Sequence, residues 1–222
     1  MVKRSLWRWL LVLGLFLPML AGCGGGGHSA PIIVEPGLVG IEDRPRVSLT
    51  APELTVEYAR PGVPGTFVVR ILSDQLRDGD IAFDPVQNSY TITQGPDTLL
   101  FGIDFALPNQ PEYRAFLDFP LDGSTGEAVI PLDASILSAT LTVFVNFVDF
   151  SAAVPVLLDL VQYSVTAGLT PADYTSLPLG VRAFEIFNAD TGRDVNIDVT
   201  NLMREAQLRG LADFQLRFLL GP

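Results

Sequence analysis

The sequence predicts an all-β domain, a sandwich of two antiparallel sheets with one short helix near the C-terminus. Three observations predict this fold. Apolar and polar residues alternate in segment after segment, which is the period of a β-strand. Proline and glycine clusters at 60–62 and 95–97 separate such segments as turns. Only the segment 200–209 places apolar residues at helical spacing, so helix is a minor component.

The composition agrees with a folded domain that has a sizeable core. Of the 222 residues, 48% are apolar and only 18% are charged. A disordered chain, a collagen or a coiled coil would each need a different balance of apolar, glycine and charged residues. A chain of this length buries roughly 70% of its extended surface when it folds. The fold can therefore rest on core packing.

The expected strands share a period of two and a high content of β-branched and aromatic residues. They lie at 54–58, 66–72, 99–106, 113–119, 140–147, 156–165, 195–199 and 214–218. In the expected helix, Leu202, Met203 and Ala206 form an apolar face that packs against the sheet. Thr200 is expected to cap its first turn, and Gly210 to end it in the left-handed conformation.

The N-terminus carries an export signal. Lys3, Arg4 and Arg8 precede an apolar run over 9–20, which is typical of a secretory signal peptide and too short to span a bilayer. The run ends in Leu20-Ala21-Gly22-Cys23, which resembles the lipobox of bacterial lipoproteins. The resemblance implies that lipoprotein-processing enzymes attach a diacylglycerol to Cys23 and cut before it. The alternative is an ordinary signal peptide with a chance cysteine at the cleavage site.

Three segments follow from this interpretation. Residues 1–22 are the signal peptide, 23–31 a flexible glycine-rich tether, and 32–222 the β-sandwich domain. Two or three acyl chains would anchor the protein to a membrane without a transmembrane helix. Gly24, rather than an aspartate, follows the cysteine, and in lipoproteins this implies sorting to the outer membrane of the cell envelope.

Cleavage also removes much of the chemistry available to an enzyme. The mature chain would keep 11 basic residues, all arginine, against 25 acidic ones, so its net charge is 11 − 25 = −14. Nucleic acid is therefore not an expected partner. His28, the only histidine, lies in the tether, and no lysine or tryptophan remains. A Ser-His or Cys-His nucleophile, a lysine Schiff base and a zinc site of His and Cys are all excluded from the domain.

Three motifs in sequence order suggest a family. They are the arginine–aromatic strand at 113–119, the Ser-Ala-Thr-Leu strand opening within 136–141, and the Asp-Val-Thr helix start at 198–202 followed by the terminal strand. In this order they resemble DNRLRE-type domains, over roughly 80–220. That family is similar to carbohydrate-binding modules, so the resemblance implies a jelly-roll form of the sandwich and accessory rather than catalytic function.

Two acidic motifs could carry chemistry. Asp190-Thr191-Gly192 matches the core of an aspartic protease, but it occurs once, and we interpret 188–193 as a hairpin loop. Four aspartates, Asp74, Asp78, Asp80 and Asp84, crowd the segment around Gly79, where oxygen ligands could hold Ca²⁺. A solvated acidic turn is the alternative reading, and no other cofactor is expected.

Sugar binding usually relies on exposed aromatic rings that stack against the sugar. Tyr90 and Tyr174 lie in polar or proline-bounded segments and are the expected exposed rings. Each could instead be a rim residue of the sandwich.

Two classes of function remain. The first is a non-catalytic binding or structural module displayed at the envelope, whose partner is a polysaccharide or another envelope protein. The second is a carboxylate-dependent hydrolase acting on polysaccharide, which needs two acidic groups about 5 to 10 Å apart in a cleft. We favour the module, because the sequence shows no convincing carboxylate pair and lacks the other catalytic side chains.

Overall fold

The computed structural model describes residues 36–43, 51–127 and 129–222, which belong to one compact unit. The expected signal peptide 1–22, the lipobox with Cys23 and the tether 23–31 lie outside the described residues. Within the described part of the chain, no helix has the length and apolar character needed to cross a membrane.

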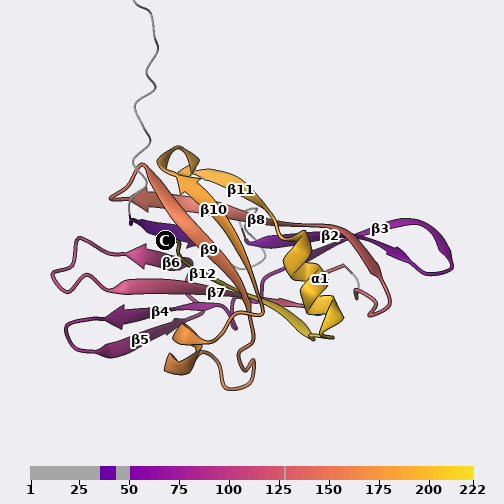
Figure 1. Ribbon diagram of the computed structural model, residues 1–222, viewed down its shortest axis with the longest axis horizontal. Coiled ribbons are helices and arrows are strands. Elements are labelled where there is room, and N and C mark those ends of the chain that lie inside the picture. Colours follow the sequence, from indigo (N-terminus) through magenta and orange to yellow (C-terminus); the bar gives the residue numbers. More distant parts are fainter. Residues whose placement is uncertain (1–35, 44–50, 128) are drawn as a thin grey trace, which may run out of the picture. The chain divides into compact units, whose positions relative to one another are not determined.

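The described residues are mostly strand, and the strands follow one another closely (Figure 1). The strands are β1 (Leu38–Glu42), β2 (Glu53–Arg60), β3 (Val63–Leu72), β4 (Gly79–Asp84), β5 (Ser89–Gln94), β6 (Thr98–Ile103), β7 (Glu112–Pro120), β8 (Ser135–Asp149), β9 (Ala153–Val161), β10 (Gly180–Phe187), β11 (Arg193–Asp198) and β12 (Asp213–Leu220). The helical elements are the 3-10 turns η1 (Pro171–Thr175) and η2 (Asn188–Asp190) and the helix α1 (Thr200–Leu208). The all-β prediction with a single short α-helix is thus confirmed.

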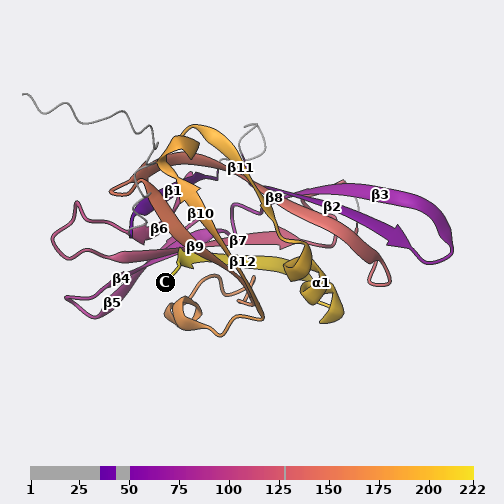
Figure 2. The same ribbon diagram turned by 45° about the horizontal axis from the view of Figure 1, so that its top comes forward.

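All strand pairs are antiparallel, and they form one continuous sheet that curls over on itself (Figure 2). Its main path runs β10-β9-β12-β7-β6-β1-β8-β2-β3. The sheet branches at β7, which pairs with β4, β6 and β12, and at β8, which pairs with β1, β2 and β11. The hairpins β2–β3 and β4–β5 project at opposite ends of the domain (Figure 1). The two faces of the sandwich are therefore parts of one hydrogen-bonded sheet.

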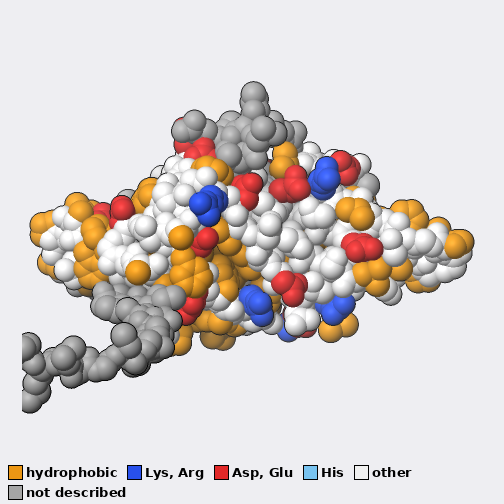
Figure 3. Space-filling model, turned by 90° about the horizontal axis from the view of Figure 1, so that it is seen from above, with side chains coloured by type: hydrophobic (Ala, Val, Ile, Leu, Met, Phe, Trp, Pro, Cys, Tyr) orange, Lys and Arg blue, Asp and Glu red, His pale blue; other side chains and the backbone are white. Residues whose placement is uncertain are grey.

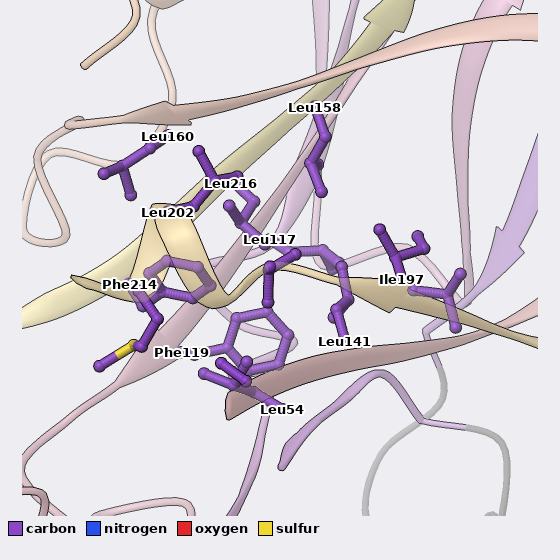
Figure 4. Close-up of a cluster of buried hydrophobic side chains, with 14 of the residues drawn as sticks. Leu54, Leu117, Phe119, Leu141, Leu158, Leu160, Ile197, Leu202, Phe214 and Leu216 are labelled. Atoms are coloured by element: carbon purple, nitrogen blue, oxygen red, sulfur yellow. The ribbon is translucent and has the colours of Figure 1, made fainter. Parts of the chain in front are cut away.

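The curled sheet encloses one large apolar core, shown in part in Figure 4. Its side chains come from strands far apart in the sequence and from α1; the labelled ones are Leu54, Leu117, Phe119, Leu141, Leu158, Leu160, Ile197, Leu202, Phe214 and Leu216. Each of these is at most 4% exposed. Burying such a side chain contributes about 1.5–3 kcal/mol, so this packing can sustain a fold in which no disulfide is expected.

Several local predictions are confirmed and two are corrected. The apolar face of α1 is buried as expected, and Gly210 ends the helix at φ +65°. Thr200, however, is the first helical residue rather than the cap, and its amide and hydroxyl both donate to Asp198 Oδ1. The loop 188–193 turns at Gly192, φ +75°, but β10 pairs with β9 and β11 with β8. It is thus a crossover rather than a hairpin loop.

Candidate functional site

The β4–β5 hairpin has two chemically different faces. Because side chains alternate along a strand, Phe83 and Tyr90 pair on one face, while Ala82 and Thr91 pair on the other. The first face is aromatic and packs on the η1 turn, whereas the second is lined by hydroxyl and amide groups.

The aromatic face brings the two sequence-predicted tyrosines together. The centroids of the Tyr90 and Tyr174 rings lie 5.2 Å apart, and Phe83 lies 5.1 Å from Tyr90 and 6.0 Å from Tyr174. The guanidinium of Arg114 lies 3.9 Å from the centroid of the Tyr174 ring, in a cation–π contact. Aromatic and cationic neighbours therefore surround the Tyr174 ring.

The expectation that both rings are exposed holds only for Tyr90. Tyr90 is 38% exposed, but Tyr174 is 4% exposed, so its ring cannot stack on a ligand without local opening. Burial raises the pKa of Tyr174 well above its usual range, and its hydroxyl donates to the Glu112 carbonyl at 3.4 Å. The sequence prediction failed here because η1, although bounded by proline and polar residues, folds inward.

A buried ion pair fixes η1 in that inward position. Arg217 on β12 and Asp159 on β9 are 3% and 4% exposed and form a charge pair. The guanidinium of Arg217 also donates to the carbonyls of Asp173, Tyr174 and Ser176 at 2.8, 3.0 and 2.9 Å. One charged side chain thus satisfies the backbone of the turn that carries Tyr174. The aromatic face is, in this geometry, a packing surface.

The polar face of the hairpin opens into a groove of about 350 Å³. It is lined by Ala82, Asp84, Gln87, Ser89, Thr91, Thr93, Leu107, Asn109, Pro111 and Tyr113. The residues Gln87, Ser89, Thr91 and Thr93 are exposed, and the Tyr113 side chain is half-buried. Exposed hydroxyl and amide side chains therefore line the groove together with a half-buried tyrosine.

Asp84 holds the rim of this groove in shape. Its Oδ1 accepts hydrogen bonds from the amides of Val86 and Gln87 at 2.8 and 3.0 Å, and its Oδ2 accepts one from Asn109 at 2.8 Å. These contacts, the Gln87 amide first, lower the pKa of Asp84, so the carboxylate stays ionised. Asp84 ties the β4–β5 turn to the β6–β7 loop and cannot serve as a general acid near neutral pH.

Two residues that line the groove, Thr93 and Tyr113, interact with nearby aspartates. The Thr93 hydroxyl bonds to the carboxyl of Asp80, which is 3% exposed and accepts the Leu100 amide at 3.2 Å. Burial raises the pKa of Asp80 to about 6. Burial, together with Asp104 and Asp80, also raises the pKa of Tyr113, so its phenol is neutral and can donate a hydrogen bond.

The four aspartates considered as Ca²⁺ ligands lie in four different environments. Asp74 pairs with Arg77 at 3.1 Å, Asp78 Oδ1 accepts the Asp118 amide at 2.6 Å, and Asp80 and Asp84 belong to β4 and are bonded as described above. Their expected loop is partly strand. Within the described residues, no three acidic, histidine or cysteine side chains meet as a metal site would require.

A buried acidic cluster lies below the β3–β4 connection. Asp43, Asp78 and Asp118 are at most 1% exposed, and the carboxyls of Asp43 and Asp78 interact with each other. Desolvation by burial raises the pKa of Asp43 to about 7 and of Asp118 to about 6, and it raises the pKa of Asp78 well above its usual range. Arg77 donates to Asp118 Oδ2 at 3.2 Å, and Gln215 donates to its Oδ1 at 2.8 Å.

The acidic cluster has raised pKa values like those of a catalytic carboxyl pair, but its carboxyls are buried and a substrate could not reach them. Asp43 Oδ2 and Asp78 Oδ2 are buried without a donor, which fits one proton held between the two carboxyls. The carboxyls of Asp43 and Asp78 are at most 1% exposed, and the pocket lined by Arg77, Gln94 and residues 163–168 includes neither of them. We interpret the cluster as a structural contact that joins the β3–β4 connection to β7 and to the end of β1.

Sequence reasoning missed the groove because it treated the segment around Gly79 as a loop. The pattern Ser89-Tyr90-Thr91-Ile92-Thr93 alternates hydroxyl residues with large apolar ones, and this alternation predicts a strand with one polar face. Read as a strand, it would have pointed to the hydroxyl face as well as to Tyr90.

No family model, no curated protein and no solved structure matches this chain. The resemblance to DNRLRE-type domains therefore stays a prediction.

Proposed function

We propose that this protein is an exported, lipid-anchored envelope protein that displays a non-catalytic module, and that the polar groove of the module binds a neutral polysaccharide. The observation that supports this most directly is the composition of the groove. Hydroxyl and amide side chains from β5 and the flanking loops surround the half-buried ring of Tyr113. Sugars present hydroxyl groups and an apolar ring face, and such a lining complements both.

The charge of the groove favours a neutral sugar chain over an acidic one. Asp84 is ionised, and Asp104 and Asp80 act electrostatically on Tyr113. No arginine lines the groove among its described residues. An acidic polysaccharide would meet only negative charge there, whereas a neutral one loses nothing to repulsion.

The same lining supports binding rather than hydrolysis. Glycoside hydrolysis needs two carboxyl groups on opposite sides of the scissile bond, one of them a protonated acid. Asp84 is the one carboxylate among the residues that line the groove, and its pKa is lowered. Asp43, Asp78, Asp80 and Asp118, whose pKa values are raised, are at most 3% exposed, and none of them is among the residues that line the groove.

The anchor rests on the lipobox residues Leu20, Ala21 and Gly22 before Cys23. Intact-mass measurement of the purified full-length product tests it. A mature chain that begins at Cys23 and carries diacylglycerol supports the anchor, and a free thiol on Cys23 or a different start overturns it. Lipase treatment should remove the two ester-linked acyl chains, and the accompanying loss of mass gives their size.

The binding function is tested by a glycan screen of the detergent-solubilised lipoprotein. We expect neutral polysaccharides among the ligands, and we expect Thr91→Val to weaken their binding because valine keeps the β-branched shape but removes the hydroxyl. Thr66→Val is the matched control, since Thr66 is an exposed strand threonine on β3 in the opposite hairpin. Binding that survives Thr91→Val, or no binding to any glycan, would contradict the proposal.

A further inference from the structure

An exposed aromatic pair lies at one end of the domain. Phe105, in the β6–β7 loop, and Phe150, in the β8–β9 turn, make an edge-to-face contact with ring centroids 5.7 Å apart. They are 40% and 46% exposed, so each ring covers the other only partly. Figure 3, which shows one face of the molecule, has hydrophobic side chains at both ends and over part of the middle, with charged side chains scattered among them.

The backbone at Phe150 makes this exposure unusual. Phe150 has φ +67°, a conformation that suits glycine or asparagine and costs other residues about 1–2 kcal/mol. A small or polar residue would relieve the backbone and the exposed apolar area together. The turn instead presents an aromatic ring to solvent beside a second one, which indicates a surface that contacts something apolar.

The described chain enters the sheet beside this pair. The Gly37 carbonyl accepts a hydrogen bond from the Ile103 amide at 2.8 Å, and Leu38 pairs with Gly102 on one side and with Asp149 on the other. Phe105 follows Ile103 by two residues and Phe150 follows Asp149 directly. The point of entry therefore lies between the two loops that carry the aromatic rings.

From these observations we propose that Phe105 and Phe150 insert into the interface of the bilayer that holds the Cys23 lipid; this inference rests on the lipid anchor of the proposed function. The chain from Cys23 to Pro36 contains 36 − 23 = 13 residues beyond the cysteine, a reach of about 43 Å at about 3.3 Å per residue. A reach of this length does not by itself determine which face of the domain meets the bilayer. The aromatic pair, which lies beside the first described residues of the chain, gives the domain one preferred orientation on the membrane.

The charges around the pair determine the kind of bilayer. The segments 103–111 and 148–152 contain Asp104 and Asp149 but no lysine or arginine. Aromatic rings are favoured at the membrane interface, whereas carboxylates are repelled by anionic headgroups. The surface therefore fits a zwitterionic bilayer, and anionic lipid should weaken the contact at low salt.

The mature chain offers a clean optical test because both tryptophans, Trp7 and Trp9, leave with the signal peptide. The variant Phe105→Trp of the full-length lipoprotein then carries a single tryptophan at the pair. The control Leu177→Trp carries one in a loop at the far end of β9, where Leu177 is 88% exposed. Each is reconstituted into phosphatidylcholine vesicles that contain brominated lipid, after its lipidation has been checked by mass.

For Phe105→Trp we expect a blue-shifted emission and quenching of the fluorescence by brominated lipid, whereas for Leu177→Trp we expect neither. The quenching in Phe105→Trp should become weaker when Phe150 is also changed to serine. It should also become weaker when phosphatidylglycerol is added to the vesicles. Equal emission from both variants on lipidated protein overturns the proposal but leaves the anchor standing. A blue shift that appears only at high protein density, without quenching by brominated lipid, shows that the pair contacts a second copy of the chain. That result also overturns the proposal. An unlipidated Cys23 overturns the anchor and this inference together.

Discussion

Tyr90 and Tyr174 are in contact, with ring centroids 5.2 Å apart, yet 38% of Tyr90 and only 4% of Tyr174 reaches solvent. The two rings come from β5 and η1, which are far apart in sequence. Tyr174 is the inner member, covered by Arg114 and Phe83, and Tyr90 is the outer one. Their roles in stability should therefore differ strongly.

Tyr174→Ala should lower the free energy of unfolding by about 3–5 kcal/mol, the usual range for truncating a buried aromatic side chain. Tyr90→Ala should cost about 1 kcal/mol, because much of its ring is already in water. Urea unfolding followed by far-ultraviolet circular dichroism measures both. Equal losses for the two variants would show that the assignment of inner and outer ring is wrong.

Removing the carboxylate of the buried Arg217–Asp159 pair should destabilise the fold far more than removing that of an exposed pair. Asp159→Asn leaves the Arg217 guanidinium buried without its carboxylate, and such a loss costs about 3–5 kcal/mol. Glu205→Gln is the control, since Glu205 and Arg209 form an exposed pair at 2.7 Å worth less than about 1 kcal/mol. If both variants unfold at the same urea concentration, Arg217 does not hold η1 as described.

The acidic cluster predicts a pH dependence of stability. Asp43, Asp80 and Asp118 have pKa values raised in the folded state to about 7, 6 and 6. The unfolded chain releases these protons near pH 4 while the folded chain keeps them, so these groups lower stability as pH rises from about 4 to about 7. The pKa values of three other aspartates, Asp84, Asp122 and Asp198, are lowered in the folded state. Their contribution to stability is therefore lost as the pH falls below about 4.

Asp43→Asn removes the carboxyl whose pKa is raised most among these three aspartates, and it keeps the size of the side chain. It should raise stability at pH 8 by on the order of 2–4 kcal/mol relative to the wild type and flatten the slope between pH 4 and 7. Asp133→Asn, at an exposed loop position, should leave the slope unchanged. Urea unfolding at a series of pH values measures how the free energy of unfolding changes with pH. An unchanged slope in Asp43→Asn would show that the acidic cluster does not cause this pH dependence.

Gly102 should be intolerant of any side chain. A Cβ at this position would lie 1.9 Å from the Gly37 carbonyl oxygen, and the residue has φ +111°. Gly102→Ala should therefore cost about 3 kcal/mol or more. Gly62→Ala serves as the control, because Gly62 also has positive φ, +74°, but has open space around it, and it should cost about 1–2 kcal/mol. Thermal unfolding separates the two, and similar losses would mean that the close approach of β1 to β6 is absent.

The period of two was enough to predict the fold class and most strands, including β2, β3, β7 and β12. It did not predict β1, β4, β5 or β10. For β4 the reason is that aspartate is uncommon in strands, and the sequence there was interpreted as an acidic loop. Asp80 sits in that strand because the Leu100 amide and the Thr93 hydroxyl bond to it, and those partners come from β6 and β5. Contacts between distant segments override local preference, and alternation alone does not show them.

The candidate site was less accessible to sequence reasoning for the same reason. Tyr90 could be identified as an exposed ring, but the burial of Tyr174 depends on Arg217, which lies 43 residues later in the chain. The groove depends on Asp84 binding Asn109 across two loops. Both features come from side chains that bridge separate elements, so they became visible only in the folded structure.

The central claim, that the hydroxyl face of the β4–β5 hairpin binds a neutral polysaccharide, is tested most directly by backbone amide NMR of the protein titrated with an oligosaccharide from the screen. The claim predicts chemical-shift changes confined to residues that line the groove: on β5 around Thr91 and Thr93, on the β6–β7 loop around Asn109, and at Tyr113 near the start of β7. Shifts that map instead to Tyr90 and η1 on the aromatic face, or to residues far from the groove, would contradict it.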